Sequence, residues 1–205
     1  MILLYPINAK TPLYPCCLGE QNRMCQNNFM RGSFFQSVFV TIVIAVILRL
    51  FVIQPFVVDG ASMEPSFQHQ EYIMIDKLSY RFRPPARGEV VVFHPPTNPT
   101  ENYIKRIIGL PTETVRIDNG EVYIDGHRLT EAYLGKNQHS TLPFTKTSSI
   151  TLKDDEYFVL GDNRAHSSDS RDWGPLSLKA IEGRTWYVLF PVDEFHAVNK
   201  PEYVF

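Results

Sequence analysis

The sequence predicts a mainly β protein in which one N-terminal transmembrane helix precedes an all-β domain of antiparallel sheets. Three observations predict this class. One apolar run of membrane length occupies residues 34–53, the apolar segments after it are short and rich in β-forming residues, and most of the 15 prolines follow it and discourage long helices. We therefore expect a cytosolic leader at residues 1–32, a membrane anchor at residues 33–54 and an extracytoplasmic domain at residues 55–205.

The composition excludes several classes of protein. With 205 residues and a formal net charge of −2, the chain has no basic field to attract nucleic acid, so no nucleic-acid partner is expected. Cys16, Cys17 and Cys25 all precede the apolar run, so the main domain contains no disulfide. Their spacing fits no common zinc site, and reduced cytosolic thiols are the simpler interpretation. We expect neither a metal nor a cofactor.

The apolar run at residues 34–53 has about the length of a helix that crosses a bilayer. Lys10, Arg23 and Arg31 precede it against the single acid Glu20, and this positive excess predicts a cytoplasmic N-terminus and an exported C-terminal domain. A cleavable signal peptide would have a shorter apolar core followed by small residues at a cleavage site. A buried helix of a soluble core would need a helical partner, and the rest of the sequence predicts none of comparable length.

Short apolar segments after the anchor predict the strands of the domain. They are Tyr72–Ile75, Val90–Phe93, Glu113–Ile117, Glu121–Ile124, Glu156–Leu160 and Arg184–Phe190. The residues Asn119-Gly120 predict a tight hairpin because this pair accepts positive φ, and a second turn follows at Asp125-Gly126. Residues 130–150 are polar and weakly patterned, so we expect a surface excursion there.

Two residues carry the candidate chemistry. Ser62 lies in the segment GASMEP soon after the anchor, and Lys105 lies in the apolar segment YIKRIIG. Lysine normally has a pKa near 10.4, but burial among apolar side chains lowers that pKa by several units. A neutral lysine can take the proton of a serine hydroxyl while the oxygen attacks a carbonyl. Each residue alone also has a simpler interpretation, because Ser62 can begin a turn and Lys105 can point to solvent.

A dense polar loop, GDNRAHSSDSR at residues 161–171, directly follows the predicted strand at residues 156–160. On composition alone it is a hydrophilic surface turn, although closely spaced Asp and Arg can also stiffen a loop that presents hydroxyls to a site. These three segments, in this order after one anchor, resemble type I signal peptidases, and RGEVVVF at residues 87–93 resembles another segment of that family. The resemblance covers most of residues 54–192.

The resemblance implies a membrane-bound serine endopeptidase of mainly β fold that removes signal peptides from exported preproteins with a Ser–Lys dyad. Matched residue by residue, Ser62 corresponds to the nucleophile and Lys105 to the general base. Ser167 corresponds to the hydroxyl that hydrogen-bonds the lysine and orients it. The family's structural ion pairs correspond to Asp169 with Arg171 and to Asp162 with Arg106.

The oxyanion hole and the substrate pockets follow from the same resemblance. The main-chain N–H of the nucleophile, here Ser62, is one oxyanion donor in the family. Some members add a serine hydroxyl two residues earlier, where this chain has Gly60, so we place Gly60 with Ser62 at the oxyanion hole and expect the second donor to be a backbone N–H or water. The family cuts extended segments after small residues of the Ala-x-Ala type. The positions that correspond to its pockets are Phe56, Val58, Asp59, Tyr103 and Ile104.

The partners that the resemblance implies are preproteins with signal peptides, the lipid bilayer and, by proximity, the secretion translocon. An enzyme held at the bilayer meets a membrane-held substrate at a raised effective concentration. One departure from the family lies after Leu110-Pro111, where Thr112 and Glu113 replace Gly-Asp. Threonine lacks glycine's freedom at positive φ, so we expect a local adjustment of that turn without loss of activity.

Three alternatives remain open at this point. A self-cleaving protease of the repressor type shares the Ser–Lys pair, but it is soluble and carries a DNA-binding module. A Ser–His–Asp hydrolase using His166 or His139 would need a Gly-x-Ser-x-Gly elbow, which the sequence lacks. A non-catalytic, membrane-tethered β domain that binds exported proteins would not need Ser62, Lys105 and Ser167 together.

Overall fold

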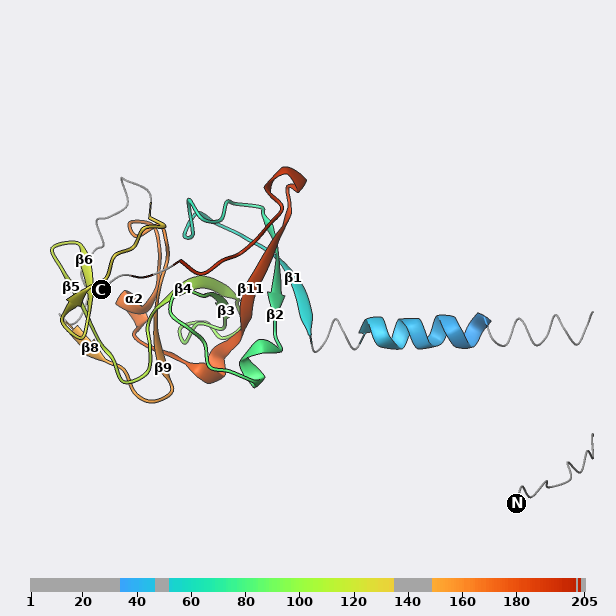
Figure 1. The fold of residues 1–205 in the computed structure, drawn as a ribbon, viewed down its shortest axis with the longest axis horizontal. Coiled ribbons are helices and arrows are strands. Elements are labelled where there is room, and N and C mark those ends of the chain that lie inside the picture. Colours follow the sequence, from blue (N-terminus) through green and yellow to red (C-terminus); the bar gives the residue numbers. More distant parts are fainter. Residues whose placement is uncertain (1–33, 47–51, 135–148, 202, 204–205) are drawn as a thin grey trace, which may run out of the picture. The chain divides into compact units, whose positions relative to one another are not determined.

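The computed structural model describes residues 34–46, 52–134, 149–201 and 203 of a chain that divides into two compact units, residues 1–46 and 47–205 (Figure 1). In the first unit, residues 34–46 form an α-helix whose side chains are exposed. Across the ranges just given, none of the helices combines the length and the apolar character needed to cross a membrane.

The predicted anchor and leader fall largely outside the described residues. The leader at residues 1–32 lies wholly outside them, as do residues 33 and 47–51 of the anchor. The predicted C-terminal end of the anchor was wrong. Ile53 and Gln54 belong to a strand, because their backbone pairs with Asp76 and Ile75 of the next strand.

The second unit is built almost entirely of strands. They are β1 (Ile53–Val57), β2 (Tyr72–Asp76), β3 (Val90–Phe93), β4 (Tyr103–Gly109), β5 (Thr114–Asp118), β6 (Glu121–Ile124), β7 (His127–Arg128), β8 (Ser149–Thr151), β9 (Glu156–Leu160), β10 (Leu176–Ser177), β11 (Ile181–Phe190) and β12 (His196–Ala197). Four single-turn helices accompany them: η1 (Ser79–Arg81), α2 (Ser170–Trp173), η2 (Leu178–Ala180) and η3 (Val192–Glu194).

The strands form two antiparallel sheets. The larger sheet has the order β1-β2-β11-β3-β4-β9-β10, with β12 paired to β11, and the smaller has the order β7-β6-β5-β8. In Figure 1 the smaller sheet lies at the end of the domain opposite β1 and β2. β11 is ten residues long and pairs with both β2 and β3, with two register shifts along β2 and one along β3. Such shifts bend a strand. The mainly β fold of antiparallel sheets is confirmed.

The predicted strands are observed with small shifts at their ends. β2, β5 and β11 differ from the predicted ranges by one to three residues at an end, and β3, β6 and β9 match. Both predicted turns take positive φ: Asn119 and Gly120 have φ of 49° and 82°, and Asp125 and Gly126 have φ of 49° and 85°. These are the conformations that join two-residue hairpins, here β5 to β6 and β6 to β7.

The surface excursion predicted at residues 130–150 was wrong for its first part. Residues 135–148 lie outside the described residues, but Glu131 and Leu134 are buried. A polar residue can be buried when its charge is paired, and Glu131 pairs with the buried guanidinium of Arg164. That partner is 33 residues away in the sequence, so local polarity gave no sign of it.

Buried apolar residues of the described part form three clusters, and two of them support the loops that concern function. Met63 and Phe67 pack with Val90, Val92 and residues of β2 beneath the β1–β2 loop. A second cluster lies between β9 and the smaller sheet, and a third joins β3, β4 and β9. The segments that carry polar candidates are therefore fixed to the core by apolar side chains within a few residues of them.

Candidate active site

Ser62 lies in the loop between β1 and β2, and this loop is closed at its base by backbone hydrogen bonds. The Val58 N–H donates to the Glu71 carbonyl (2.8 Å), and the Gln70 N–H donates to the Val58 carbonyl (2.8 Å). Met63, the next residue after Ser62, is buried to 1% exposure. The half-buried Ser62 thus follows an exposed stretch of chain and precedes a firmly packed side chain.

The polar loop after β9 holds Ser62 from the other side. The Asn163 N–H donates to the Ser62 carbonyl (3.1 Å), and Asn163 Nδ2 donates to the Ala61 carbonyl (3.0 Å). Gly161 lies so close to this contact that a Cβ on it would stand 2.5 Å from the Ser62 carbonyl oxygen and 2.2 Å from Ser167 Oγ. No side chain other than hydrogen fits there, so the loop can approach the serine only with glycine at this position.

Lys105 lies on β4 and points its amine at Ser62. Its Nζ is 2.8 Å from Ser62 Oγ and 2.9 Å from the Ile104 carbonyl oxygen, and the residue is 4% exposed. Burial lowers the pKa of Lys105 from 10.5 to about 8; the carboxylates of Asp169 and Asp162 oppose this shift, and the guanidinium of Arg171 adds to it. The site therefore holds a serine hydroxyl against an amine that loses its proton near pH 8, well below the usual range for lysine.

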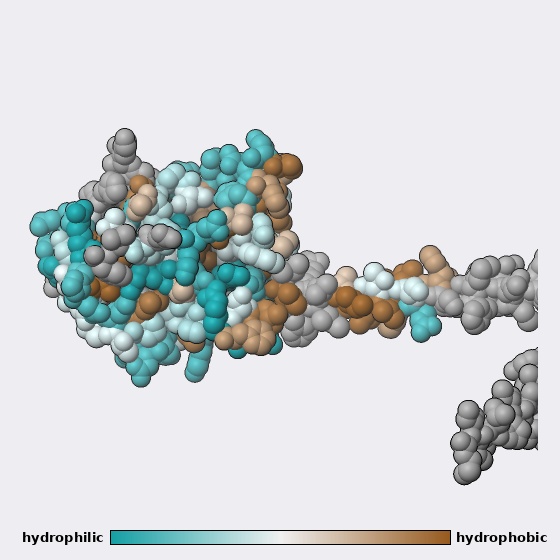
Figure 2. Space-filling view, viewed as in Figure 1, coloured by the Kyte–Doolittle hydropathy of each residue, from teal (hydrophilic) through white to brown (hydrophobic). Residues whose placement is uncertain are grey.

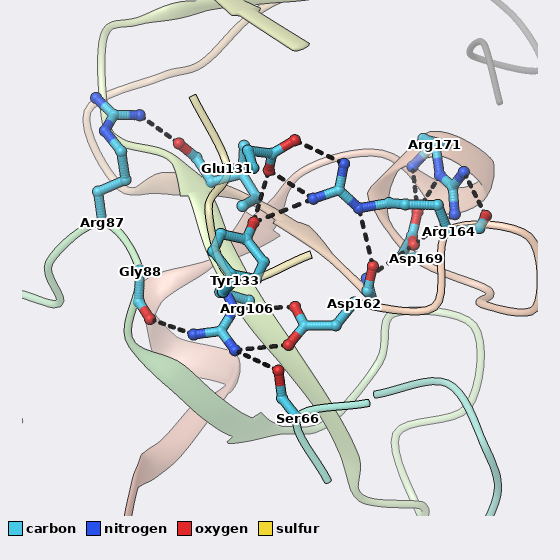
Figure 3. A network of polar contacts seen from close by, with 12 residues as sticks. Ser66, Arg87, Gly88, Arg106, Glu131, Tyr133, Asp162, Arg164, Asp169 and Arg171 are labelled. Atoms are coloured by element: carbon cyan, nitrogen blue, oxygen red, sulfur yellow. Dashed lines mark hydrogen bonds and ion pairs between the residues drawn. The ribbon is translucent and has the colours of Figure 1, made fainter. Parts of the chain in front are cut away.

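The predicted pairing of Asp162 with Arg106 places a buried ion pair directly behind Lys105. Arg106 Nε and Nη2 donate to the two Asp162 oxygens at 2.9 and 2.6 Å, and both side chains are at most 4% exposed. Arg106 also donates to the Gly88 carbonyl (3.0 Å) and to Ser66 Oγ (3.3 Å), as Figure 3 shows. One guanidinium thereby connects β4, the serine loop and the polar loop.

Asp169 and Arg171, the second predicted pair, close the polar loop on itself. Arg171 Nε and Nη2 each lie 2.8 Å from an Asp169 oxygen, and Asp169 also accepts the Gly161 N–H (3.0 Å). Arg171 further donates to the Arg164 carbonyl (2.8 Å). Asp169 is the N-cap of α2, and its carboxylate accepts the Arg171 N–H.

Ser167 is placed differently from the prediction. Its hydroxyl donates to Asp169 Oδ2 (2.8 Å), and none of the hydrogen bonds in the described part of the chain joins Ser167 to Lys105. The one proton of the Ser167 hydroxyl is thus given to Asp169, so toward other groups its oxygen acts only as an acceptor. The orientation of Lys105 by Ser167 stays a prediction, while the Ile104 carbonyl is the second group that holds the amine in place.

Gly60 is also placed differently from its predicted role as an oxyanion donor. Its N–H already donates to His69 Nδ1 (3.1 Å), so this group is engaged within the serine loop. Gly60 has a φ of 98°, a conformation that favours glycine. His69 was not among the predicted site residues, and its position seven residues after Ser62 carried no signal in the sequence.

A cleft of about 450 Å³ opens beside Ser62 and Lys105. All five predicted pocket residues line it, Phe56, Val58 and Asp59 from the side of β1 and Tyr103 and Ile104 from β4. Lining residues that the sequence analysis missed are Val57, Ile73, Val92, Glu101, Asn102 and Ser168. Val57 and Asn102 are direct chain neighbours of predicted positions, whereas Ile73 and Val92 reach the cleft through the fold.

A further buried ion pair, also missed by the sequence analysis, supports the polar loop. Arg164 donates to both Glu131 oxygens (2.9 and 2.5 Å), to the Tyr133 hydroxyl (3.1 Å) and to the Gly161 carbonyl (3.1 Å). The Tyr133 ring in turn lies 4.2 Å from the Arg106 guanidinium carbon. Figure 3 shows Tyr133 between Arg106 and Arg164, with Glu131 beside Arg164, so the segment after β7 links both ion pairs.

The remaining candidates lie away from this chemistry. His166 is exposed and does not line the cleft, and His139 lies outside the described residues. Within the described ranges no group of three or more His, Cys, Asp and Glu side chains is arranged to hold a metal ion. The three cysteines lie outside those ranges.

Comparisons with known proteins identify the family of the chain. Residues 31–190 match the family described as signal peptidase, peptidase S26. The chain is 36% identical over 172 residues to the probable signal peptidase I-1 of Synechocystis, covering 80% of this chain and 85% of that protein. It is 38% identical over 165 residues to the signal peptidase I of Bacillus amyloliquefaciens, covering 78% and 88%.

Two further comparisons concern a third relative and a solved structure. The signal peptidase I S of Bacillus subtilis is 33% identical over 174 residues, covering 80% of this chain and 91% of that protein. A crystal structure of a signal peptidase I from Enterococcus faecalis aligns with 36% identity over 50% of this chain and 97% of its own, with a TM-score of 0.44. By its family match and these relatives, the chain belongs to the type I signal peptidases of peptidase family S26, the serine endopeptidases that remove signal peptides.

Proposed function

We propose that Ser62 is the nucleophile of this peptidase and Lys105 its general base. The observation that carries the proposal is the 2.8 Å contact between Lys105 Nζ and Ser62 Oγ, made by an amine whose burial lowers its pKa to about 8. A base with a pKa near the working pH is both largely available and strong enough to accept a proton. No other pair of side chains lining the cleft in the described residues combines a hydroxyl with a base at hydrogen-bond distance.

The proposed reaction runs in two halves. Neutral Lys105 takes the Ser62 proton as the oxygen attacks the scissile carbonyl, and the Ser62 N–H donates to the oxyanion that forms. Lys105 then passes the proton to the departing amine, which leaves an acyl-enzyme on Ser62. In the second half, Lys105 takes a proton from water, the hydroxide attacks the ester, and the proton returns to Ser62 as the new carboxyl end is released.

The cleft supports a substrate that is an extended peptide cut after small residues of the Ala-x-Ala type. Phe56, Val58 and Ile104 line it with apolar surface close to Ser62, and β1 lies at the edge of the larger sheet, where a peptide strand can add. The substrates implied are preproteins that carry signal peptides. Proximity to the translocon is part of the proposal, because signal peptides emerge there.

The proposed location is a membrane that the chain crosses once, with the N-terminus cytoplasmic and residues 55–205 on the other side. The exposed apolar helix at residues 34–46 and the positive excess before it support this orientation. Figure 2 shows apolar surface at the tip of the domain where β11 ends. Exposed side chains in this region are Tyr72, Phe190, Val192 and Phe195.

The competing function is a tethered β domain that binds exported proteins without cutting them. The test is cleavage of a preprotein with an Ala-x-Ala site by the full, detergent-solubilised chain and by Ser62→Ala and Lys105→Arg. Ser62→Ala removes the attacking hydroxyl, and Lys105→Arg replaces the base with a group that stays protonated near neutrality. Each variant is therefore expected to lose at least about 10³-fold in kcat/KM. Lys179→Arg, at an exposed lysine, serves as the matched control.

The same assay read against pH tests the base. We expect kcat/KM of the wild type to rise through an apparent pKa near 8, because the amine must be neutral to act. A profile that keeps climbing beyond pH 10 would remove Lys105 from this role. Equal cleavage by wild type and both folded variants would make the binding domain the better description.

A further inference from the structure

A second cleft, of about 530 Å³, opens in a gap of the larger sheet. β3 and β12 both pair with the edge of β11 that β2 leaves free, β3 as far as Arg184 and β12 from Tyr187 onward. The cleft lies between these two strands. Its walls are residues 88–90, where β3 begins, and residues 198–200, which follow β12. It shares no lining residue with the active-site cleft, so it is a separate site.

Cations outnumber carboxylates in this cleft. Its charged lining residues are Arg83, Arg184, Lys200 and Glu89. Glu89 accepts two hydrogen bonds from Arg83, at 2.5 and 3.1 Å, so these two charges neutralise each other. Glu89 also accepts from the Tyr80 hydroxyl (3.0 Å) and from the Ala86 N–H (2.9 Å). The carboxylate is therefore already fully engaged, and Arg184 and Lys200 determine the charge that a ligand meets.

Three donor groups of the cleft have hydrogen-bonding capacity left for a ligand. Arg184 donates to Asp76 through Nε (3.0 Å), and its two terminal amino groups make no hydrogen bond within the described part of the chain. Lys200 is exposed and takes part in no hydrogen bond or ion pair among the same residues. Thr185 is 4% exposed, and its hydroxyl also lacks a partner there. A buried hydroxyl without a partner costs free energy, and a bound ligand can supply that partner.

These donors fit a phosphate group. A guanidinium presents paired N–H groups that match two phosphate oxygens, and an ammonium adds a compact positive charge. A tetrahedral phosphate has further oxygens for the hydroxyl of Thr185. Asp76 balances the charge of Arg184, so Arg184 supplies direction and Lys200 supplies the charge without a counterion.

The strand register places the cleft near the end of the apolar run at residues 34–53. Ile53, the last residue of that run, pairs with Asp76, and Asp76 pairs on its other side with Arg184. Neighbouring strands are about 4.8 Å apart, so the Arg184 backbone is about 10 Å from that of Ile53. The headgroup layer on each side of a bilayer is about 5–8 Å thick. The phosphates of a membrane that the run crosses are therefore within reach of the Arg184 side chain.

We propose that this cleft binds the phosphate of an anionic phospholipid headgroup and so attaches the catalytic unit to the bilayer at a second point besides the anchor. The proposal rests on the membrane location given above. An anionic lipid is favoured over a zwitterionic one because the cation of a zwitterionic headgroup would be repelled by Lys200. Attachment at two points restricts the orientation of the catalytic unit on the membrane that also holds the preprotein.

The test is a ¹⁵N NMR titration of the full chain in micelles of an uncharged detergent. The probe is dihexanoyl phosphatidylglycerol, a short-chain anionic phospholipid, and dihexanoyl phosphatidylcholine and inorganic phosphate are titrated separately. We expect the amide signals of Thr185 and Lys200 to shift with the anionic lipid until they saturate. The zwitterionic lipid and free phosphate should each bind at least about tenfold more weakly, because one lacks net charge and the other lacks the contacts of the lipid.

Two variants test the two groups that mark the site. Lys200→Glu reverses the charge that lacks a counterion, and we expect the Kd for the anionic lipid to rise at least about tenfold. Thr185→Val removes the hydroxyl while keeping the shape of the side chain, and the Kd should rise at least about threefold. Lys179→Glu, at an exposed lysine that does not line this cleft, is the matched control and should change the Kd by less than about twofold.

Several results would overturn the proposal. Equal weakening by Lys179→Glu and Lys200→Glu would mean diffuse attraction to the surface instead of a site. Equal affinity for the zwitterionic lipid, or an absence of saturable shifts at Thr185 and Lys200, would exclude an anionic headgroup in the cleft. Inorganic phosphate that binds as tightly as the anionic lipid would show that the ligand is free phosphate.

Cleavage assays separate this proposal from that of the dyad. In vesicles, the wild type should cut a preprotein at least about threefold faster with anionic lipid than with zwitterionic lipid alone, and Lys200→Glu should lose this gain. In detergent, Lys200→Glu should cut a soluble peptide as the wild type does. Failure of the Ser62–Lys105 proposal would instead appear as cleavage by Ser62→Ala, with the lipid titration unaffected.

Discussion

The burial of the Lys105 amine lowers the stability of the fold and, by lowering the pKa of the amine, supplies the site with a base. The amine is almost fully enclosed, and the charged form that an unfolded chain carries at neutral pH is the form that burial disfavours. The Ser62 hydroxyl and the Ile104 carbonyl give it two contacts, but neither carries a full charge. The low pKa of the base is therefore produced mainly by the removal of water, while the carboxylates of Asp169 and Asp162 oppose the shift and the guanidinium of Arg171 adds to it.

The free energy of unfolding should record this cost. A fall in pKa from 10.5 to about 8 corresponds to about 3 kcal/mol at about 1.36 kcal/mol per pH unit. The penalty is complete below pH 8 and disappears as the pH rises through 10.5, because the unfolded chain then also loses the proton. We expect Lys105→Met to be inactive and more stable by about 1–3 kcal/mol at pH 7, with the difference shrinking at pH 11.

Denaturant unfolding at the two pH values measures this difference in the solubilised protein. Lys179→Met, at an exposed lysine, should show no comparable gain. A Lys105→Met variant less stable than wild type at pH 7 would mean that the amine is stabilised by its contacts, and the desolvation argument would not hold.

The turn between β4 and β5 is a second place where local conformation and residue type disagree. Thr112 has a φ of 71°, although a β-branched residue rarely adopts positive φ. The sequence predicted a local adjustment of this turn to threonine; instead the backbone keeps the positive φ that glycine favours. Glu113 accepts the Leu110 N–H (2.7 Å) and pairs with Arg87, and these contacts hold the turn in place.

Thr112→Gly should therefore stabilise the protein. Relief of the positive φ is worth about 1–2 kcal/mol, and the greater freedom of glycine in the unfolded chain offsets about half of it, so a gain of about 0.5–1 kcal/mol is expected. Thr97→Gly, at an exposed turn position with no positive φ, is the matched control and should destabilise. Urea unfolding distinguishes the two, and a loss of stability in both would show that the turn is not strained.

The sequence predicted those strands and turns whose conformation is set by their own residues, and it missed features that depend on distant parts of the chain. β3, β6 and β9 are compact runs with apolar side chains, and the Asn-Gly turn takes its conformation from its own residues. β1 overlaps the last two residues of the predicted anchor and runs directly on from it, so it was not recognised as a strand. β10 and β12 are two residues long, too short for any periodic pattern. The Glu131–Arg164 pair and the Gly60–His69 contact required the fold, because each joins a loop to a partner that no local pattern specifies.

At the scale of the whole molecule, the candidate site is assembled from three separate segments. Ser62 and Lys105 are 43 residues apart in the chain, and Arg106 and Asp162 are 56 apart. The family resemblance predicted that these residues form one site, because it rests on several motifs in a fixed order along the chain. Spacing alone would have left each with its simpler role, a turn serine and a strand lysine.

Division of the chain into two units leads to a prediction about where the enzyme works. Residues 47–205 form the unit that contains the cleft, so a chain limited to them should cut a soluble peptide within about threefold of the full chain. It should lose about 10²-fold or more on a preprotein held in vesicles, because the shared bilayer no longer raises the effective concentration. Equal loss on both substrates would mean that residues 1–46 support the site itself.

The dryness around Lys105 also bears on the timing of catalysis. With a pKa of about 8, about one enzyme molecule in ten holds a neutral amine at pH 7 while the cleft is open to water. A peptide lying along the cleft displaces solvent from the same walls that surround the amine. We expect the pKa of Lys105 to fall further when a peptide is bound, so that binding of the substrate raises the fraction of neutral base. The free enzyme, in which most of the lysine is protonated, would then react only slowly with other carbonyl groups.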